Sequence, residues 1–151
     1  VDELAAWWSA QGHGDWADLR ERALEILQRE DQLQQIVQLI GADALPDDQR
    51  LILETARLLR DGFLQQTAAD EIDAFASVEK QIRMLELIVE FHDRASTLVE
   101  RGCPVVVIHD LSVVERIVRI KQTVANDQIE RLSEIRRLLD KEMRELERSY
   151  L

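Results

Sequence analysis

Several residue types are scarce in this sequence, and each scarcity argues against a class of structure. The 151 residues include one cysteine, two prolines, five glycines and 5% aromatic residues. Cys103 is alone and cannot form a disulfide within the chain. The low glycine, proline and aromatic content argues against a β-sandwich or barrel. Uninterrupted apolar runs such as Val105 to Ile108 are far shorter than the roughly 20 residues that cross a bilayer, so we expect no direct membrane insertion.

Positive charge is also scarce. The chain has 19 Lys and Arg residues against 30 Asp and Glu residues, a formal net charge of −11. Because nonspecific phosphate binding depends on clustered Lys and Arg, we expect no nucleic-acid partner. The chain has no initiating Met and no signal sequence, and it starts inside a helical pattern. We therefore expect a piece of a longer protein, and one cysteine is compatible with a reducing cytosol.

Helix-forming residues dominate what is present: Leu, Ile, Glu, Arg, Gln and Ala. With 46% hydrophobic residues, the chain is long enough for one domain with a real core. We predict an all-α fold in which residues 1–151 form one bundle of about five to seven helices.

The most informative stretch is 33–66, where two helical patterns meet at a short acidic turn. Their apolar stripes consist of Leu33, Ile36, Val37 and Ile40, then Leu51, Ile52, Thr55, Leu58 and Leu59. Gly41 can adopt the left-handed conformation that closes a helix, and Pro46 fits the first turn of the next one. This predicts a helix-turn-helix hairpin whose tip projects. Asp43, Asp47 and Asp48 lie at that tip, where a helix N-terminus favours negative charge.

Spacing and capping signals predict the other helices. Their expected ranges are 2–10, 15–40, 47–63, 77–102 as the central core element, 112–121 and 126–151, with caps at Asp2, Asp15, Ser77, Ser112 and Asn126 or Asp127. Trp7 and Trp8 on the first helix are interpreted as buried anchors at the domain edge rather than as a partner-binding patch. The last helix, 126–151, either is peripheral and forms a coiled-coil contact or packs on the domain's own surface.

Two segments carry a resemblance to a known family. IVQLIGADALPDDQRLILETARLLRDGFLQQ and the following TAADEIDAF are similar to the C-terminal helical domain of the catalytic A subunit of A/V-type rotary ATPases, and the resemblance runs from about Leu19 to Ile120. More distantly, GADALPDDQ resembles the acidic hairpin of the F-type beta subunit, which bears on the rotating shaft. The resemblance implies that the short segment 104–111 is a helical turn, although its β-branched residues would also suit a strand.

The resemblance also implies two sets of site residues. The implied contacts with the central stalk are Asp43, Ala44, Leu45, Pro46, Asp47, Asp48 and Gln49, and we expect apolar Leu45 and the shape of the turn to matter at least as much as the charges. The implied nucleotide-proximal residues are Gln66, Thr67, Ala68 and Phe75. Thr67 replaces an Asn of the family pattern and Ala69 an aromatic residue, which removes a stacking surface for adenine. Phe75 is otherwise a core residue.

Catalytic motifs are absent from the chain. It has no phosphate-cradling loop with its Lys, and Asp47–Asp48 is better explained as a solvated helix start than as an acid–base pair. His13, His92, His109 and Cys103 share no ligand-like spacing, so we expect no metal, and His92 is expected to be a hydrogen-bonded core or boundary residue. The fragment alone should catalyse nothing and hold no cofactor. ATP or ADP and Mg²⁺ would bind the full subunit.

Three hypotheses follow. The favoured one is the C-terminal fragment of a catalytic A subunit that transmits nucleotide-driven motion to the central stalk. The whole enzyme would couple ATP synthesis or hydrolysis to proton or sodium transport. The fragment's partners would then be the rest of the A subunit, B subunits and stalk subunits, in a cytoplasmic, peripheral part of a membrane-associated complex. The alternative is a free-standing helical interaction module that binds through Trp7, Trp8 and the last helix. The third is an A subunit whose nucleotide site has drifted.

Overall fold

The structure, a computed structural model, describes residues 16–64, 74–119 and 128–151, with side chains for 16–61, 81–119 and 130–151. This part of the chain is helical throughout apart from short turns, which confirms the all-α prediction. Its α-helices are α2 (Trp16–Ile40), α3 (Asp47–Leu58), α5 (Ala74–Glu100), α6 (Val105–His109), α7 (Ser112–Arg119) and α8 (Gln128–Tyr150). Two short elements complete it, the 3₁₀ turn η1 (Ala42–Ala44) and the π-helical turn η2 (Leu59–Leu64).

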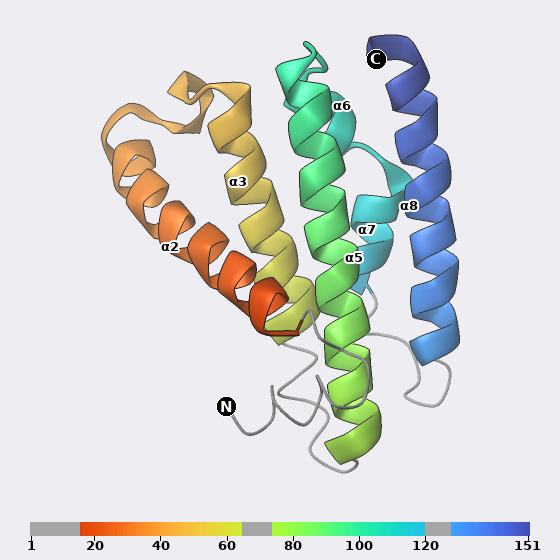
Figure 1. The fold of residues 1–151 in the computed structure, drawn as a ribbon. Coiled ribbons are helices and arrows are strands. Elements are labelled where there is room, and N and C mark those ends of the chain that lie inside the picture. Colours follow the sequence, from red (N-terminus) through yellow and green to blue (C-terminus); the bar gives the residue numbers. More distant parts are fainter. Residues whose placement is uncertain (1–15, 65–73, 120–127) are drawn as a thin grey trace.

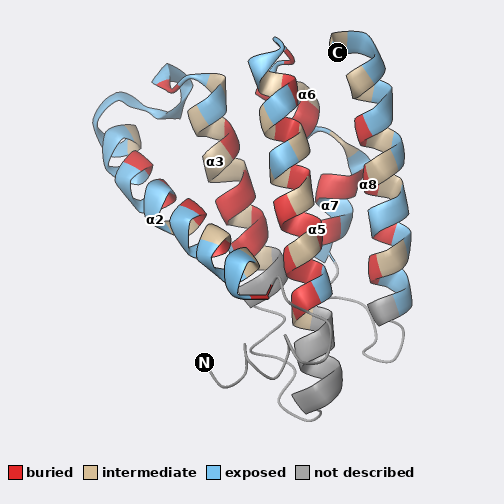
Figure 2. Ribbon diagram, in the orientation of Figure 1, coloured by how far each residue is buried: buried red, intermediate tan, exposed pale blue. Residues whose placement is uncertain are grey.

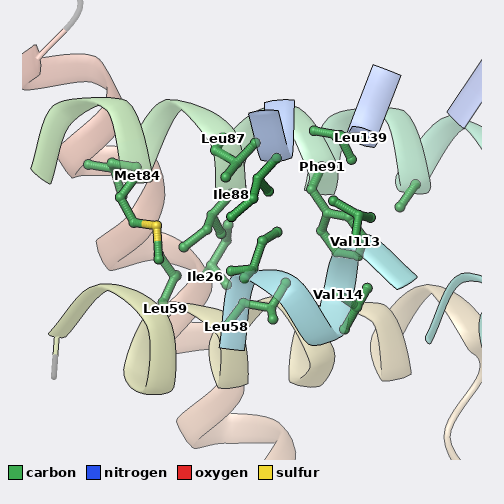
Figure 3. Packing of buried hydrophobic residues seen from close by; sticks show 14 of the residues in the cluster. Ile26, Leu58, Leu59, Met84, Leu87, Ile88, Phe91, Val113, Val114 and Leu139 are labelled. Atoms are coloured by element: carbon green, nitrogen blue, oxygen red, sulfur yellow. The ribbon is translucent and has the colours of Figure 1, made fainter. Parts of the chain in front are cut away.

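Helix α5 is the central element, as predicted. Helices α2 and α3 pack on one side of it and α8 on the other, with α6 and α7 between α3 and α8 (Figure 1). Buried residues line the inward faces of the helices while their outward faces are exposed (Figure 2). Phe91 of α5 is fully buried and lies close to Val113 of α7 and Leu139 of α8 (Figure 3). Burying a side chain of this size contributes about 1.5–3 kcal/mol, which explains why the other helices assemble around α5.

The end of α5 is specified by Gly102. Its φ of 98° lies in the left-handed region, which costs glycine least. The Cys103 amide donates to the Leu98 carbonyl at 2.9 Å and the Gly102 amide to the Val99 carbonyl at 3.0 Å. These two bonds form a Schellman motif, which satisfies carbonyls that a helix end would otherwise leave unpaired.

Some predicted boundaries are wrong. Helix α5 begins at Ala74, so Ser77 lies inside it and does not cap it. The good helix formers before Ser77 allow the helix to start earlier. Helix α3 ends at Leu58 and continues as the wider turn η2, in place of regular helix to Phe63. Ser112 is the first residue of α7, whose N-terminus receives its cap from another helix, as described below.

Other predicted elements are observed as expected. The predicted helix 15–40 is described from Trp16 to Ile40 as the one helix α2, and segment 104–111 contains the short helix α6 rather than a strand. Helix α8 packs along α5 and buries an apolar stripe made of Leu132, Ile135, Leu139 and Met143. Of the two alternatives for the last helix, the structure therefore has the one in which it packs on the domain's own surface. The predicted helix 2–10 and the caps Asn126 and Asp127 lie outside the described residues.

Candidate interaction site at the α2–α3 hairpin

The turn between α2 and α3 has the positive φ that the sequence predicts at Gly41, but Pro46 is placed differently from the prediction. Gly41 has a φ of 87°, and its amide donates to the Val37 carbonyl at 2.8 Å. The chain then makes η1 and reaches Pro46, which lies one residue before α3 with φ −60° and ψ 158°. Its carbonyl accepts bonds from the Gln49 and Arg50 amides at 3.1 and 3.0 Å. Proline thus precedes the first turn instead of lying within it.

The tip is neither folded inward nor straightened into a rod. Asp43 and Asp48 are both exposed. The hairpin turn lies at the same end of the bundle as the α5–α6 turn and the C-terminus (Figure 1). The tip is therefore one part of a broad end surface, and not a solitary arm.

Asp47 has a structural partner that the sequence did not indicate. Its Oδ2 accepts a hydrogen bond from the Val105 amide at 3.0 Å, at the start of α6, where Pro104 supplies no side-chain cap. A carboxylate in this position satisfies an unpaired helix amide and favours the N-terminal end of the helix dipole. Asp47 therefore fixes the hairpin to α6, and only Asp43 and Asp48 remain as exposed carboxylates of the turn.

Leu45 corrects the expectation of an apolar residue offered at the tip. Its side chain is only 6% exposed, so it anchors the turn to the domain and has little surface available to contact a partner. Of the neighbouring residues, Ala44 and Pro46 are exposed and Gln49 is half-buried.

The end of α2 supplies the apolar surface instead. Leu39 is 85% exposed, Ile40 61% and Ile36 40%, so the described chain does not supply the partner surface that the apolar stripe needs at Ile36 and Ile40. The reason is that α2 leans away from the bundle towards the turn (Figure 1). One signal could have indicated this, since adjacent Leu39 and Ile40 point about 100° apart and cannot both face one core.

Two polar contacts join α3 to its neighbours, one to α5 and one to α6. The Thr55 Oγ1 and His92 Nδ1 atoms are hydrogen-bonded at 2.7 Å, which confirms His92 as a hydrogen-bonded residue at the core boundary. Burial lowers the pKa of His92, and Arg22 lowers it further, although Asp93 opposes this. Glu54 of α3 pairs with His109 of α6 at 2.9 Å. These contacts hold α3 in place behind the tip.

The nucleotide-proximal residues are not brought together by the described structure. Gln66, Thr67 and Ala68 lie outside the described residues, as do Trp7 and Trp8. Phe75 lies in the first turn of α5, and its side chain is outside the description. Within residues 16–64, 74–119 and 128–151, no three His, Cys, Asp or Glu side chains are grouped to hold a metal ion, and no helix is long and apolar enough to span a bilayer.

The fold and site together define an all-α bundle domain with a surface-exposed helical hairpin. Residues 5–106 match a family model described as the C-terminal domain of V and A type ATP synthase. Over 146 residues, 97% of its length, the chain is 45% identical to the A subunit of the A-type ATP synthase of Methanopyrus kandleri. Over 141 residues, 92% of its length, it is 43% identical to the protein of the same name from Saccharolobus solfataricus.

The chain therefore belongs to the family of C-terminal domains of V and A type ATP synthases. It spans about a quarter of the length of these curated relatives, 25% and 24%. The similarity supports the ATP synthase hypothesis over a free-standing interaction module.

Proposed function

We propose that this chain is the C-terminal domain of a catalytic A subunit, in which it transmits nucleotide-driven motion to the central stalk of a rotary ATPase complex. The observation that carries the proposal is the composition of the hairpin end. The exposed carboxylates of Asp43 and Asp48 and the exposed apolar side chains of Leu39 and Ile40 belong to the turn and to the two helix ends that it joins. We define these four residues as the hairpin contact surface.

The hairpin contact surface suits a coiled-coil partner that carries basic residues. Apolar side chains of this exposure gain free energy when a partner covers them, at about 25 cal/mol per Å². The two carboxylates would orient the partner more than they would add to the binding free energy, because an exposed ion pair contributes about 0–1 kcal/mol.

Force transmission also requires that the tip move with the domain. Buried Leu45 and the Asp47–Val105 bond tie the turn to the bundle, and the close-packed core around α5 resists deformation. A displacement at the base of the bundle would then reach the tip as a rigid-body motion.

The rest of the assembly belongs to the same proposal. ATP or ADP with Mg²⁺ would bind the part of the subunit that precedes this chain, with Gln66, Thr67, Ala68 and Phe75 near the nucleotide. The B subunits and stalk subunits would be its neighbours, on the cytoplasmic side of a membrane-associated complex. The whole machine would couple ATP synthesis or hydrolysis to ion transport.

Site-directed cross-linking in the assembled complex tests the contact. An Asp43→Cys variant labelled with a maleimide–benzophenone reagent should photo-cross-link to the central stalk, and background from the native thiol of this chain is low because Cys103 is buried. The matched control is Glu134→Cys on exposed α8, which should give no stalk product. Equal stalk cross-linking by the two variants, or none by Asp43→Cys, would contradict the proposal.

A further inference from the structure

Helix α8 carries a strongly basic surface on an acidic chain. An open groove of about 800 Å³ between α5 and α8 is lined by six basic residues and two acidic ones. The basic residues are Arg83, Arg136, Arg137, Lys141, Arg144 and Arg148. With a net charge of −11 for the whole chain, this concentration of positive charge contrasts with the rest of the molecule.

Four of these residues form one continuous stripe. Arg137, Lys141, Arg144 and Arg148 follow one another at spacings of four, three and four, which places them on one face of α8 over about 16 Å. All four are exposed, and the stripe points away from the buried Leu139 and its apolar neighbours. We call these four residues the α8 basic stripe.

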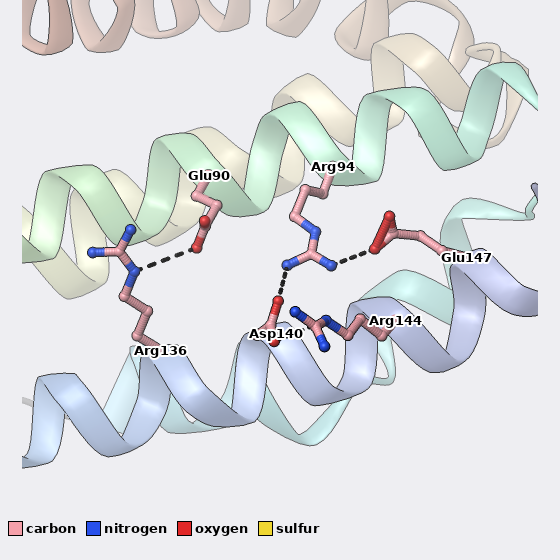
Figure 4. Close-up of polar contacts among 6 residues, drawn as sticks. All are labelled: Glu90, Arg94, Arg136, Asp140, Arg144 and Glu147. Atoms are coloured by element: carbon pink, nitrogen blue, oxygen red, sulfur yellow. Dashed lines mark hydrogen bonds and ion pairs between the residues drawn. The ribbon is translucent and has the colours of Figure 1, made fainter.

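The chain's own carboxylates compensate the stripe incompletely. Arg144 pairs with Asp140 at 3.0 Å, but the same Asp140 also accepts a bond from Arg94 of α5 at 2.9 Å, and Arg94 is further bound to Glu147 (Figure 4). In the described part of the chain, Arg137, Lys141 and Arg148 have no ion pair. Six bases and two acids give the groove lining a formal net charge of +4. Like charges three or four residues apart destabilise a helix by about 0.2–0.5 kcal/mol per pair, and an acidic partner would relieve that repulsion.

The surface is also held in place before any partner arrives. The Arg94 clamp joins α5 to Asp140 and Glu147 of α8 (Figure 4), and Leu132, Ile135, Leu139 and Met143 bury the opposite face of α8. A preorganised charged surface loses less conformational entropy on binding than a mobile one.

We propose that the α8 basic stripe docks an acidic helical segment of a neighbouring polypeptide. Its four cations are separated by about one helical turn each, which matches carboxylates at i, i+4, i+7 and i+11 on a partner helix. A single phosphate would need cations that converge on one point. A long nucleic acid would extend beyond the stripe over the acidic remainder of the chain, which would repel it. The stripe lies on the α8 side of the bundle, away from the α2–α3 hairpin (Figure 1), so the inference is independent of the stalk contact.

Fluorescence anisotropy with the full chain tests this proposal. The probe is a labelled, capped helical peptide of five turns with four Glu residues on one face, and the comparison is its scramble with the same composition. The chain should bind the one-face peptide more tightly than the scramble. The triple variant Arg137→Gln, Lys141→Gln and Arg148→Gln should weaken binding about tenfold or more.

The matched control neutralises three exposed bases elsewhere, Arg20→Gln, Arg116→Gln and Arg131→Gln. It makes the same change in net charge and should weaken binding by less than about threefold. Circular dichroism checks that both variants keep the helical fold. Equal loss in the two triple variants, equal binding of the scramble, or no binding would overturn the proposal. So would competition by inorganic tripolyphosphate as strong as by the peptide, or sedimentation showing that the stripe joins two copies of the chain.

Discussion

At the scale of single residues, the hydrogen-bonded pair of Thr55 and His92 is a polar contact at the edge of the core. Thr55 is fully buried, and its hydroxyl and the His92 Nδ1 atom are each other's partners. A buried imidazole with one neutral partner is more easily kept uncharged than protonated. The structure therefore predicts that His92 makes the stability of the domain depend on pH.

The sign of that dependence follows from the lowered pKa of His92, whose ordinary value is 6.5. The unfolded chain takes up a proton on this side chain at a higher pH than the folded chain does. The stabilising contribution of neutral His92 to the free energy of unfolding is therefore complete above about pH 6.5. It decreases as pH falls towards the pKa of His92 in the folded chain, by at most about 1.4 kcal/mol per pH unit. In urea unfolding between pH 7.5 and 5, His92→Gln should flatten this slope.

The titration of Asp93 does not contribute to the pH dependence of stability between pH 7.5 and 5. Its hydrogen bond to Arg22 holds the pKa of the carboxyl below its ordinary 3.8, so its stabilising contribution is lost only at still lower pH. Parallel pH profiles for the wild type and His92→Gln between pH 7.5 and 5 would contradict the assignment.

At the scale of elements, α7 depends on α8 for its N-terminus. The Glu142 carboxylate accepts bonds from the Ser112 amide at 3.2 Å, the Ser112 hydroxyl at 2.9 Å and the Val113 amide at 2.8 Å. Glu142→Ala should lower the free energy of unfolding by about 1–2 kcal/mol, as the loss of a helix cap does. In the same urea titration, Glu134→Ala on exposed α8 should change it by less than about 0.5 kcal/mol. A similar change in both variants would show that the cap contributes nothing.

The contrast between α8 and the end of α2 gives a second test at this scale. Leu139 is fully buried while Leu39 is 85% exposed. Leu139→Ala should destabilise the chain by about 2–5 kcal/mol because it leaves a cavity next to Phe91. Leu39→Ala should change the free energy of unfolding by less than about 0.5 kcal/mol. Chemical denaturation of the two variants measures both, and a large effect of Leu39→Ala would mean that the end of α2 is packed in solution.

At the scale of the whole molecule, the sequence predicts well those features of the fold that are determined by residues close together in the chain. The end of α2 at Ile40, the positive φ of Gly41 and the central role of α5 follow from periodicity and from glycine within a turn or two of chain. The site is less predictable. The bond from Val105 to Asp47 joins residues 58 positions apart, and no local pattern indicates it.

The hairpin contact surface illustrates the same limit. Leu45 and Ile40 are both large apolar residues near the turn, so the sequence does not distinguish them. In the structure Leu45 is 6% exposed and Ile40 is 61% exposed. What separates them is the angle at which α2 leaves the bundle, and this is set by tertiary packing. The α8 basic stripe, by contrast, could be found from its spacing. Only the structure shows how little of its charge is compensated by ion pairs.

The central claim is that the hairpin end passes motion from this domain to a rotating partner. The most direct measurement is the coupling ratio, ions pumped per ATP hydrolysed, in a complex reconstituted with the full-length protein carrying Leu39→Ser, Ile40→Ser, Asp43→Asn and Asp48→Asn. Because all four side chains are exposed, the domain should stay folded and ATP hydrolysis should continue, while pumping per ATP falls severalfold. A wild-type coupling ratio in this variant would contradict the account.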